Sequence, residues 1–552
     1  MPRDQHPPVS PRVVIAIGAS VEVDLRSVPG DVLRRITNGL THPNPAWERA
    51  VRMRLRVVPP PALHYYEKRG SVLRVPRGAL GLLREALDEA SVETVFDTGG
   101  VVSRSLGLRS WDEIDVDLRP YQQEAVEAML RRVQGIVRMP CGGGKTTTGA
   151  TALLRSGEPG LVLVHTRDIR DQWVATFERL SGRTPRIVSG DDEGLRPLGE
   201  REVAIATVQT LSRAGRAALP LLRSAGALLT DEAHHVPAET WRSIAEQVPA
   251  RYRWGLTATP ERSDGLTFVL SHLIGPTIFA ISTSDLIASG YLLSPTIVPV
   301  DTGWAPSEDH YPWSARCSSC SRTTPVDDPV EHRRRGSTCR SCGAAIDRHA
   351  LLDAGSLVHA RALSDLATDP GRAALVRLLA TSSARAGRTV LVLLPRKDAV
   401  VATADAIRRD GIEVVAVTGD TADREQAIDL VRSGKVPVIV ATQLADEGLD
   451  LPSIDVVVNA SGGRSQGRAK QRVGRSLRLA GRDPVVFELV DGGEFSSQWR
   501  SRFFGYVSEY GRRSVSSEDP LPPGDALAIL RRVDARSSAR DLSRENKPSV
   551  GF

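Results

Sequence analysis

The chain has 552 residues, of which 72 are basic and 66 acidic, and its formal net charge is +6. This length predicts several domains, and the hydrophobic fraction of 41% is that of a soluble globular protein, which excludes collagen-like, disordered and disulfide-scaffold chains. The first residues are polar and no apolar run approaches the roughly 18 residues of a membrane span, so we expect a cytoplasmic protein with no membrane partner.

Residues 1–115 contain no recognisable motif and are expected to form a small α+β accessory domain. Arginine alternates with apolar residues over 52–57, which is the period-2 pattern of a half-buried strand that ends before Pro59. Leu80, Leu83 and Leu87 predict a short helix with one buried stripe. The arginine row either faces water or guides nucleic acid, and both possibilities stay open.

From residue 116, short β-branched runs alternate with helix-like stretches in two series. The first series of expected strands is Gly135–Arg138, Leu161–His165, Val203–Ala206, Ala227–Thr230 and Trp254–Leu256. The second series is Thr389–Leu394, Glu413–Val417, Val438–Ala441, Asp455–Asn459 and Val485–Leu489. The pattern predicts an α/β fold class with two tandem domains, over 116–300 and 356–510, each a parallel sheet with helices on both faces. We expect a separate insertion over 301–355 and a weakly patterned, partly mobile tail over 511–552.

The run 139–146 follows an expected strand and precedes a helix-like stretch, and it contains three glycines, Gly142, Gly143 and Gly144. Such a turn points backbone N–H groups at phosphate oxygens, and the helix N-terminus adds partial positive charge. Lys145 would reach the β- and γ-phosphates of ATP, and the Thr146 hydroxyl would bind Mg²⁺. Met139 occupies the position of the first glycine in the usual pattern, and Cys141 is interpreted as a small loop residue. The alternative is a glycine-rich turn that only packs.

Two acids, Asp231 and Glu232, follow an apolar strand about 85 residues further on. Asp231 would hold Mg²⁺, and Glu232 would orient and deprotonate the attacking water. An acidic pair after a strand is often only a solvated loop, but ligands bind at the carboxyl ends of parallel strands in open α/β sheets. After a phosphate-binding turn, the pair therefore indicates a nucleotide-hydrolysing site.

At this point the sequence resembles a superfamily 2 helicase with two RecA-like domains, because the motifs of that family occur in order over residues 118–480. Arg119-Pro-Tyr-Gln122 resembles the adenine-reading element, which makes Gln122 the expected base contact. The resemblance implies nucleic-acid contacts in the first domain at Thr166, Arg167, Gln209 and Thr210. The spelling Asp-Glu-Ala-His is the DEAH form of motif II, and the resemblance implies coupling residues at His234, Thr257 and Thr259.

The second expected domain carries the remaining family motifs. Motif IV and motif V imply nucleic-acid contacts at Arg396 and Thr442, and motif V adds nucleotide contacts at Gly448 and Asp450. Motif VI implies a coupling residue at Gln471 and two catalytic arginines, Arg475 and Arg478, which would stabilise charge on the transferring phosphoryl group. Because these arginines belong to the second domain, domain closure and hydrolysis would be coupled.

Within the superfamily, the loop Pro140–Lys145 and the stretch 261–276 are most similar to the XPB-like group of DNA translocases. Arg262-Ser263-Asp264 departs from the Arg-Glu-Asp of that group, which leaves a strand-separating role for this element without support. The resemblance favours an ATP-dependent DNA helicase or duplex translocase, with DNA favoured over RNA as the partner. The alternatives are an RNA helicase, the motor subunit of a restriction or mobile-element defence complex, and a binding module that does not hydrolyse ATP.

The insertion contains two Cys-x2-Cys pairs, Cys317 with Cys320 and Cys339 with Cys342, separated by 18 residues. Four thiolates in this arrangement suit a tetrahedral structural Zn²⁺ site. Two disulfides or free thiols are the alternative, and a cytoplasmic protein favours the metal. The segment is rich in arginine, so it is either a further DNA or protein contact or a stabilised surface insertion without a partner.

Overall fold

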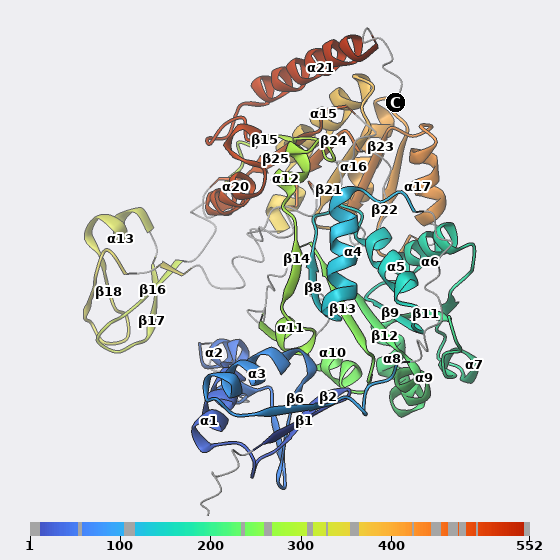
Figure 1. Ribbon diagram of the computed structural model, residues 1–552. Helices are drawn as coiled ribbons and strands as arrows, with labels where there is room; N and C mark the ends of the chain where they lie inside the picture. The colour runs from blue at the N-terminus through green and yellow to red at the C-terminus, as the bar shows by residue number, and fades with distance from the viewer. Residues whose placement is uncertain are drawn as a thin grey trace, which may run out of the picture. The chain divides into compact units, whose positions relative to one another are not determined.

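The computed structural model describes residues 12–52, 58–103, 116–232, 238–258, 268–305, 313–326, 329–350, 352–353, 364–421, 424–442, 454–461, 473, 482–492 and 495–545 (Figure 1). The chain divides into two compact units, Met1–Leu286 and Ile287–Phe552. Both are built on parallel sheets with helices, which confirms the predicted α/β class. Among the described residues, no helix is both long enough and apolar enough to cross a membrane.

The N-terminal part of the first unit is a mixed five-stranded sheet in the order β5-β6-β2-β1-β7. Its strands are β1 (Val13–Ile17), β2 (Ser20–Asp24), β5 (Glu67–Arg69), β6 (Val72–Pro76) and β7 (Thr94–Asp97). Its helices are α1 (Gly30–Gly39), α2 (Pro45–Arg52) and α3 (Leu80–Glu89), and a hairpin pairs β3 (Thr41–Pro43) with β4 (Ala62–His64). Helix α3 confirms the helix expected from the leucine spacing, with Leu83 and Leu87 fully buried. The strand expected over 52–57 is not confirmed, because Arg52 ends α2 and residues 53–57 lie outside the described part of the chain.

Two buried arginines join this small sheet to the larger sheet of the same unit. Arg77 donates to the Gly18 carbonyl at 2.6 Å and to the Ala250 carbonyl at 3.1 Å. Arg253 donates to the Val248 carbonyl at 2.7 Å and to the Ala19 carbonyl at 3.2 Å. Burial lowers the pKa of Arg77 to about 10 and that of Arg253 to about 9, so both stay charged at neutral pH. The terminal nitrogens of both guanidinium groups thus donate to backbone carbonyls on either side of the junction, whereas the buried Nε atoms of Arg77 and Arg253 have no hydrogen-bond partner among the described residues.

The central sheet of the first unit has seven strands, and all of its strand pairs are parallel, in the order β10-β11-β9-β12-β13-β8-β14. The strands are β8 (Gln134–Arg138), β9 (Gly160–Val164), β10 (Arg186–Ile187), β11 (Val203–Thr207), β12 (Ala227–Asp231), β13 (Tyr252–Thr257) and β14 (Thr277–Ala280). The helices are α4 (Pro120–Arg132), α5 (Lys145–Ser156), α6 (Arg167–Ser181), α7 (Asp192–Leu195), α8 (Val208–Ala214), α9 (Leu219–Ser224), α10 (Ala238–Ala245), α11 (Phe268–Leu273) and α12 (Thr283–Ala288). All five expected strands of this series are present, each within two residues of its predicted bounds.

The second unit has a six-stranded sheet whose strand pairs are also parallel, in the order β15-β25-β24-β21-β23-β22. Its strands are β15 (Thr296–Asp301), β21 (Val390–Leu394), β22 (Val414–Val417), β23 (Val438–Thr442), β24 (Val456–Asn459) and β25 (Val485–Val490). Its helices are α15 (Pro370–Arg385), α16 (Lys397–Arg409), α17 (Arg424–Arg432), α20 (Ser496–Tyr510) and α21 (Pro523–Glu545). Helix α20 is held by Glu488, a fully buried carboxylate that accepts from Arg502 at 2.9 Å and from Tyr506 at 2.5 Å.

Two boundaries differ from the sequence expectation. Strand β15 pairs with β25, so it belongs to the second sheet and not to the domain expected over 116–300. The tail from 511 was expected to be weakly patterned, and this is wrong for the described residues, because helix α21 spans Pro523–Glu545. Its partial mobility stays a prediction. Helix α21 buries Ala526, Leu530 and Val533 in the core of the second unit, because these side chains form one stripe at helical spacing.

The insertion is a small separate layer of short strands. Three of them, β16 (Trp313–Arg316), β17 (Thr323–Val326) and β20 (Leu352–Asp353), form one sheet in the order β17-β16-β20. A second pair is formed by β18 (Ser337–Thr338) and β19 (Ala345–Ile346), and α13 (Pro329–Arg335) lies between the two sheets in the sequence. Among the described residues of the insertion, the hydrophobic core cluster has five buried members, so the insertion needs a further source of stability.

The junction between the small sheet and the large one contains a pair of histidines with a pH-dependent consequence. His42 of β3 and His272 of α11 approach to 2.8 Å between their Nε2 atoms, and the His42 ring stacks on Phe268. Burial and the neighbouring His42 lower the pKa of His272 from 6.5 to about 4, and burial also lowers the pKa of His42. Between pH 6.5 and about 4, His272 therefore binds a proton in the unfolded chain but not in the folded chain.

We expect the free energy of unfolding to fall as the pH is lowered from 6.5 to about 4, by about 1–3 kcal/mol from this pair. Thermal melting of wild-type protein and His272→Gln across this interval measures the effect, because the variant removes the titrating ring. The wild-type curve should drop more steeply than the variant curve, with His349→Gln, an exposed histidine, as the control. Parallel curves for wild type and His272→Gln would contradict this account.

Candidate nucleotide site and cysteine cluster

The phosphate-binding turn predicted from the sequence connects β8 to α5. Gly142 and Gly144 have φ angles of 78° and 80°, in the left-handed region that favours glycine, and α5 begins directly afterwards at Lys145. Met139, which replaces the first glycine of the usual pattern, does not have a positive φ, and its side chain is fully buried. Its N–H donates to the Thr257 carbonyl at 3.0 Å. The departure at this position therefore leaves the geometry of the turn intact.

Helix α4 packs its first turn against the phosphate-binding turn through Gln122. The Gln122 Oε1 accepts from the Arg119 N–H at 3.0 Å, and its Nε2 donates to the Gly143 carbonyl at 3.2 Å. Tyr121 donates its hydroxyl to the same carbonyl at 3.1 Å. A Cβ on Gly144 would lie 2.2 Å from Gln122 Nε2, so any other residue there would displace the Gln122 amide from the turn. The structure thus places the Gln122 amide on the turn, and its expected contact with adenine stays a prediction.

The acidic pair lies at the carboxyl end of β12, two strands away from β8 in the sheet. Asp231 is buried, and its carboxylate accepts from Trp173 Nε1 at 2.7 Å and from the Glu232 N–H at 2.9 Å. Glu232 has a φ of 45°, a strained value for a residue with a side chain. Its Oε1 lies 3.2 Å from Lys145 Nζ. The first unit therefore brings together Lys145, Asp231 and Glu232, as the sequence predicted.

The electrostatics of this cluster are those of a buried, negatively charged site. Burial and the Glu232 charge raise the pKa of Asp231 to about 6, against the opposing effects of Lys145 and of the Trp173 hydrogen bond. Burial opposes the charge on Lys145, but Glu232, Cys141 and Asp231 together raise its pKa. Two carboxylates facing one ammonium leave an excess negative charge, which is the chemistry that suits a divalent cation.

These features fit a nucleoside triphosphate with Mg²⁺. The turn offers backbone N–H groups and the N-terminus of α5, which suit phosphate oxygens. Thr146 is the second residue of α5 and is half-buried, and Asp231 offers a carboxylate, so hydroxyl and carboxylate oxygens are available to a cation. Thr257, expected to couple the site to closure, ends β13 between β8 and β12 and is buried.

The predicted nucleic-acid contacts have local structural roles that the sequence analysis did not anticipate. Thr166 caps α6, because its Oγ1 accepts from the Ile169 N–H at 3.3 Å. Thr210 shares a hydrogen bond of 2.8 Å with Thr207, which caps α8. Of the residues expected to contact nucleic acid in the first unit, Arg167 and Gln209 have exposed side chains.

In the second unit, the two expected contacts differ from each other. Arg396 is paired with Asp398 at 2.7 Å. Thr442 is buried at the end of β23, and its Oγ1 has no hydrogen-bond partner among the described residues. Seven predicted site residues lie outside the described part of the chain: His234, Thr259, Gly448, Asp450, Gln471, Arg475 and Arg478.

Trp173, which contacts the predicted acidic pair, was not among the residues expected at the site from the sequence. It is fully buried on α6, and its N–H contacts the acid predicted to hold Mg²⁺. The sequence shows only that Trp173 follows Thr166 by seven residues, or two turns of a helix. This spacing does not reveal its contact with Asp231, which lies 58 residues later.

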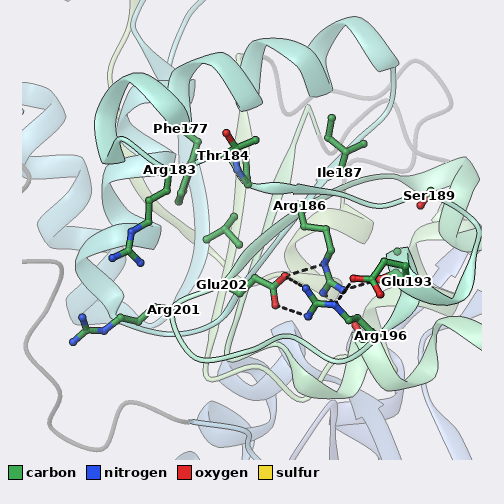
Figure 2. A pocket seen from close by; sticks show the side chains of 13 residues that line it. Phe177, Arg183, Thr184, Arg186, Ile187, Ser189, Glu193, Arg196, Arg201 and Glu202 are labelled. Carbon is green, nitrogen blue, oxygen red and sulfur yellow. Dashed lines mark hydrogen bonds and ion pairs between the residues drawn. The ribbon is translucent and has the colours of Figure 1, made fainter.

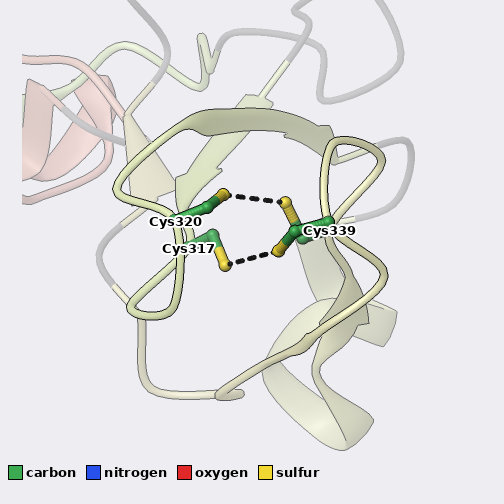
Figure 3. A group of neighbouring side chains, drawn as sticks. Cys317, Cys320 and Cys339 are labelled. Atoms are coloured by element: carbon green, nitrogen blue, oxygen red, sulfur yellow. Dashed lines mark hydrogen bonds between the residues drawn. The ribbon is translucent and has the colours of Figure 1, made fainter.

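The four cysteines of the insertion converge as predicted. Their Sγ atoms all lie within 4.8 Å of one another, with 3.6 Å between Cys317 and Cys342 and 3.6 Å between Cys320 and Cys339 (Figure 3). Tetrahedral zinc with Zn–S bonds of about 2.3 Å needs sulfur atoms about 3.8 Å apart. The donor set therefore fits a structural zinc ion.

The backbone of the two cysteine turns repeats one pattern. Cys317 donates its N–H to the Arg322 carbonyl at 2.9 Å, and Ser321 donates back to the Cys317 carbonyl at 2.9 Å. Cys339 donates to Ala344 and accepts from Gly343 in the same way, both at 2.8 Å. The closing residues Ser321 and Gly343 have φ angles of 58° and 72°. Thr324 adds a hydroxyl that donates to Cys339 Sγ at 3.2 Å, a contact of the kind that orients metal ligands.

A separate cavity of about 440 Å³ lies beside α6, β10 and α7 in the first unit (Figure 2). Two of its four arginines are paired with acids: Arg186 lies 3.1 Å from Glu202, and Arg196 lies 2.9 Å from Glu202 and 3.0 Å from Glu193. Figure 2 shows Arg183 and Arg201 directed away from this cluster. Because the carboxylates neutralise the central guanidinium groups, we assign no ligand to this cavity.

Comparison with known protein families agrees with this geometry. A model described as "Type III restriction enzyme, res subunit" matches residues 115–262, and a model described as "Helicase conserved C-terminal domain" matches residues 371–480. The two matches follow the order expected from the sequence, and neither covers half of the chain. The first matched segment contains the phosphate-binding turn and the acidic pair, and the second contains the expected arginines.

Curated relatives of these helicase domains have names of the XPB and Rad25 type. The chain is 27% identical to DNA 3′–5′ helicase Rad25 of Haloarcula marismortui, over 77% of this chain and 61% of that protein. It is 27% identical to DNA 3′–5′ translocase XPB2 of Sulfurisphaera tokodaii, over 68% and 82%, and 29% identical to DNA 3′–5′ helicase XPB of Kineococcus radiotolerans, over 66% and 58%. The chain thus spans less than two thirds of the Haloarcula and Kineococcus proteins.

Among solved structures, the chain is similar to a fragment of an HsdR subunit of a type I restriction enzyme from Vibrio vulnificus YJ016. The TM-score is 0.50 at 16% identity, and 87% of this chain and 82% of that chain are covered. At this level of identity, the likeness supports the fold of the helicase domains alone.

Proposed function

We propose that this protein is an ATP-dependent DNA helicase or duplex DNA translocase of the DEAH-box, XPB-like kind. The observation that carries the proposal is the contact between Lys145, which follows the phosphate-binding turn, and Glu232, which is adjacent to Asp231. A module that only binds nucleotide has no need of a half-buried glutamate with a strained backbone at this point.

In this proposal the γ-phosphate of ATP lies between the turn and the acidic pair. When ATP binds, the Lys145 ammonium leaves Glu232 and contacts the β- and γ-phosphate oxygens instead. Its positive charge stabilises the negative charge that develops on these oxygens during hydrolysis. Glu232 then accepts the proton of the attacking water, and its strained backbone fixes the carboxylate for this task. Asp231 and Thr146 would hold Mg²⁺, which neutralises phosphate charge when bound.

The family resemblance assigns the remaining roles. Arg475 and Arg478 supply positive charge to the phosphoryl group from the second domain, so that hydrolysis depends on closure. The coupling residues are His234, Thr257, Thr259 and Gln471, and the further nucleotide contacts are Gln122, Gly448 and Asp450. The nucleic-acid contacts are Thr166, Arg167, Gln209, Thr210, Arg396 and Thr442.

DNA is the proposed substrate because the curated relatives are named as DNA 3′–5′ helicases or translocases. The same names support movement in the 3′–5′ direction. A second candidate is the motor subunit of a restriction or defence complex, and the restriction-enzyme description of the family model favours it. In that case the effector would be on another chain.

We also propose that the cysteine cluster binds one structural Zn²⁺. The supporting observations are the matching sulfur separations, the repeated backbone pattern and the small core of the insertion. The metal would replace the hydrophobic burial that a domain of this size lacks.

Lys145→Ala and Glu232→Gln should each lower DNA-stimulated ATP hydrolysis by at least about 100-fold, because they remove phosphate stabilisation and the general base. Steady-state phosphate release measures the effect. Lys435→Ala and Glu200→Gln, which change exposed residues remote from the motifs, serve as matched controls and should behave as wild type. Wild-type rates in Lys145→Ala or Glu232→Gln would reject the site.

Elemental analysis of the purified chain should give about one zinc per molecule. Cys342→Ser should remove the zinc, because three thiolates bind far more weakly than four. Cys141→Ser is the matched control, since it changes the fifth cysteine, which lies in the phosphate-binding turn. A zinc-free wild-type protein, or one that keeps zinc after Cys342→Ser, would show that the cluster is not this metal site.

A further inference from the structure

One indole ring connects three elements of the ATP site. Trp173 is fully buried on α6 and donates its Nε1–H to Asp231 Oδ2 at 2.7 Å. The other oxygen of Asp231 accepts from the Glu232 N–H at 2.9 Å. A carboxylate with one donor on each oxygen is fixed in orientation, and a hydrogen bond to an ionised group is stronger than a neutral one.

The same ring packs against the helix that follows the phosphate-binding turn. A Cβ on Gly149 of α5 would lie 2.8 Å from Trp173 Cη2, 2.8 Å from Leu256 Cδ1 and 2.9 Å from Leu229 Cδ1. The side chains of Trp173, of Leu229 in β12 and of Leu256 in β13 therefore pack directly against the backbone of α5 at Gly149. Any shift of α6 must therefore move the indole relative to both α5 and Asp231, since a close-packed interior transmits displacement.

Helix α6 begins at the element proposed to bind nucleic acid. Thr166 caps the helix and Arg167, its first residue, is exposed. Trp173 follows Thr166 by seven residues, which is two turns of α-helix on the same side. The helix is thus a short rigid link between an exposed end and the carboxylate at the ATP site.

We propose that Trp173 is a positioning residue that holds Asp231 for Mg²⁺ and couples nucleic-acid binding at the start of α6 to nucleotide binding. The coupling rests on the proposed function, whereas the positioning rests on the contact itself. Nucleic acid that engages Thr166 and Arg167 favours the placement of α6 in which the indole N–H meets Asp231. By linkage, Mg²⁺–nucleotide then binds more tightly with DNA present, and DNA binds more tightly with nucleotide present.

The test compares Trp173→Phe with Trp241→Phe, two buried tryptophans of the same unit. Trp241 Nε1 has no hydrogen-bond partner among the described residues, so this control loses an indole of the same kind without losing a bond. Binding of a non-hydrolysable ATP analogue is titrated by calorimetry with and without Mg²⁺, and with and without duplex DNA. Trp173→Phe should weaken the Mg²⁺-dependent affinity by about 10-fold, in the range seen when a partner of a metal ligand is removed.

The DNA factor is the ratio of the analogue affinity measured with duplex DNA to the affinity measured without it. This ratio should fall toward one in Trp173→Phe, whereas Trp241→Phe should keep the wild-type ratio. Gly149→Ala, which displaces the ring without removing it, should act in the same direction. Trp254→Phe loses a hydrogen bond to the Met129 carbonyl away from the site, so it reports the effect of destabilisation alone. Melting temperatures of all four variants separate loss of folding from loss of positioning.

Wild-type Mg²⁺-dependent affinity in Trp173→Phe, or an equal loss with and without Mg²⁺, would overturn the positioning role. An unchanged DNA factor would overturn the coupling. If DNA affects neither analogue affinity nor hydrolysis in the wild-type chain, the proposed function and the coupling both fail. A selective loss of Mg²⁺-dependent affinity in Trp173→Phe would still establish the positioning role in that case.

Discussion

The structure of the first unit depends on one buried charge cluster, in which Lys145 contacts Glu232 beside Asp231. Burying two carboxylates and an ammonium costs desolvation energy that their attraction only partly offsets, and the φ of Glu232 adds strain of about 1–3 kcal/mol. The cluster exists because the parallel order β12-β13-β8 places a phosphate-binding turn and an acidic strand end at one edge of a sheet. The surrounding contacts of Trp173, Gln122 and the glycines serve to hold these groups in place.

The opposite edge of the same sheet carries the accessory domain. Gln134 at the start of β8 donates to the Arg77 carbonyl at 3.3 Å, and Arg253 near the start of β13 donates to Ala19. The accessory sheet is therefore attached at the amino ends of strands whose carboxyl ends carry the proposed ATP site. The small sheet and the domain that holds this proposed site belong to one compact unit.

The parts predicted from sequence are those in which local pattern and burial agree. Central parallel strands are buried on both faces, so they are continuous apolar runs, and every expected strand of both series is present. Strand β15 was assigned to the wrong domain, because its partner β25 lies almost 190 residues later. Helix α21 was missed because arginines surround its single buried stripe. The contact of Trp173 with Asp231 is a tertiary contact, and the cap that Thr166 gives α6 depends on where this helix begins. The family motifs specify neither feature.

In the function proposed for this protein, ATP hydrolysis at this site is coupled to movement on DNA. The most direct measurement is the rate of ATP hydrolysis by the full chain with duplex DNA, forked DNA, single-stranded DNA and RNA of matched length. We predict that DNA stimulates ATP hydrolysis more strongly than RNA does. Equal or stronger stimulation by RNA, or a rate that no nucleic acid changes, would contradict it.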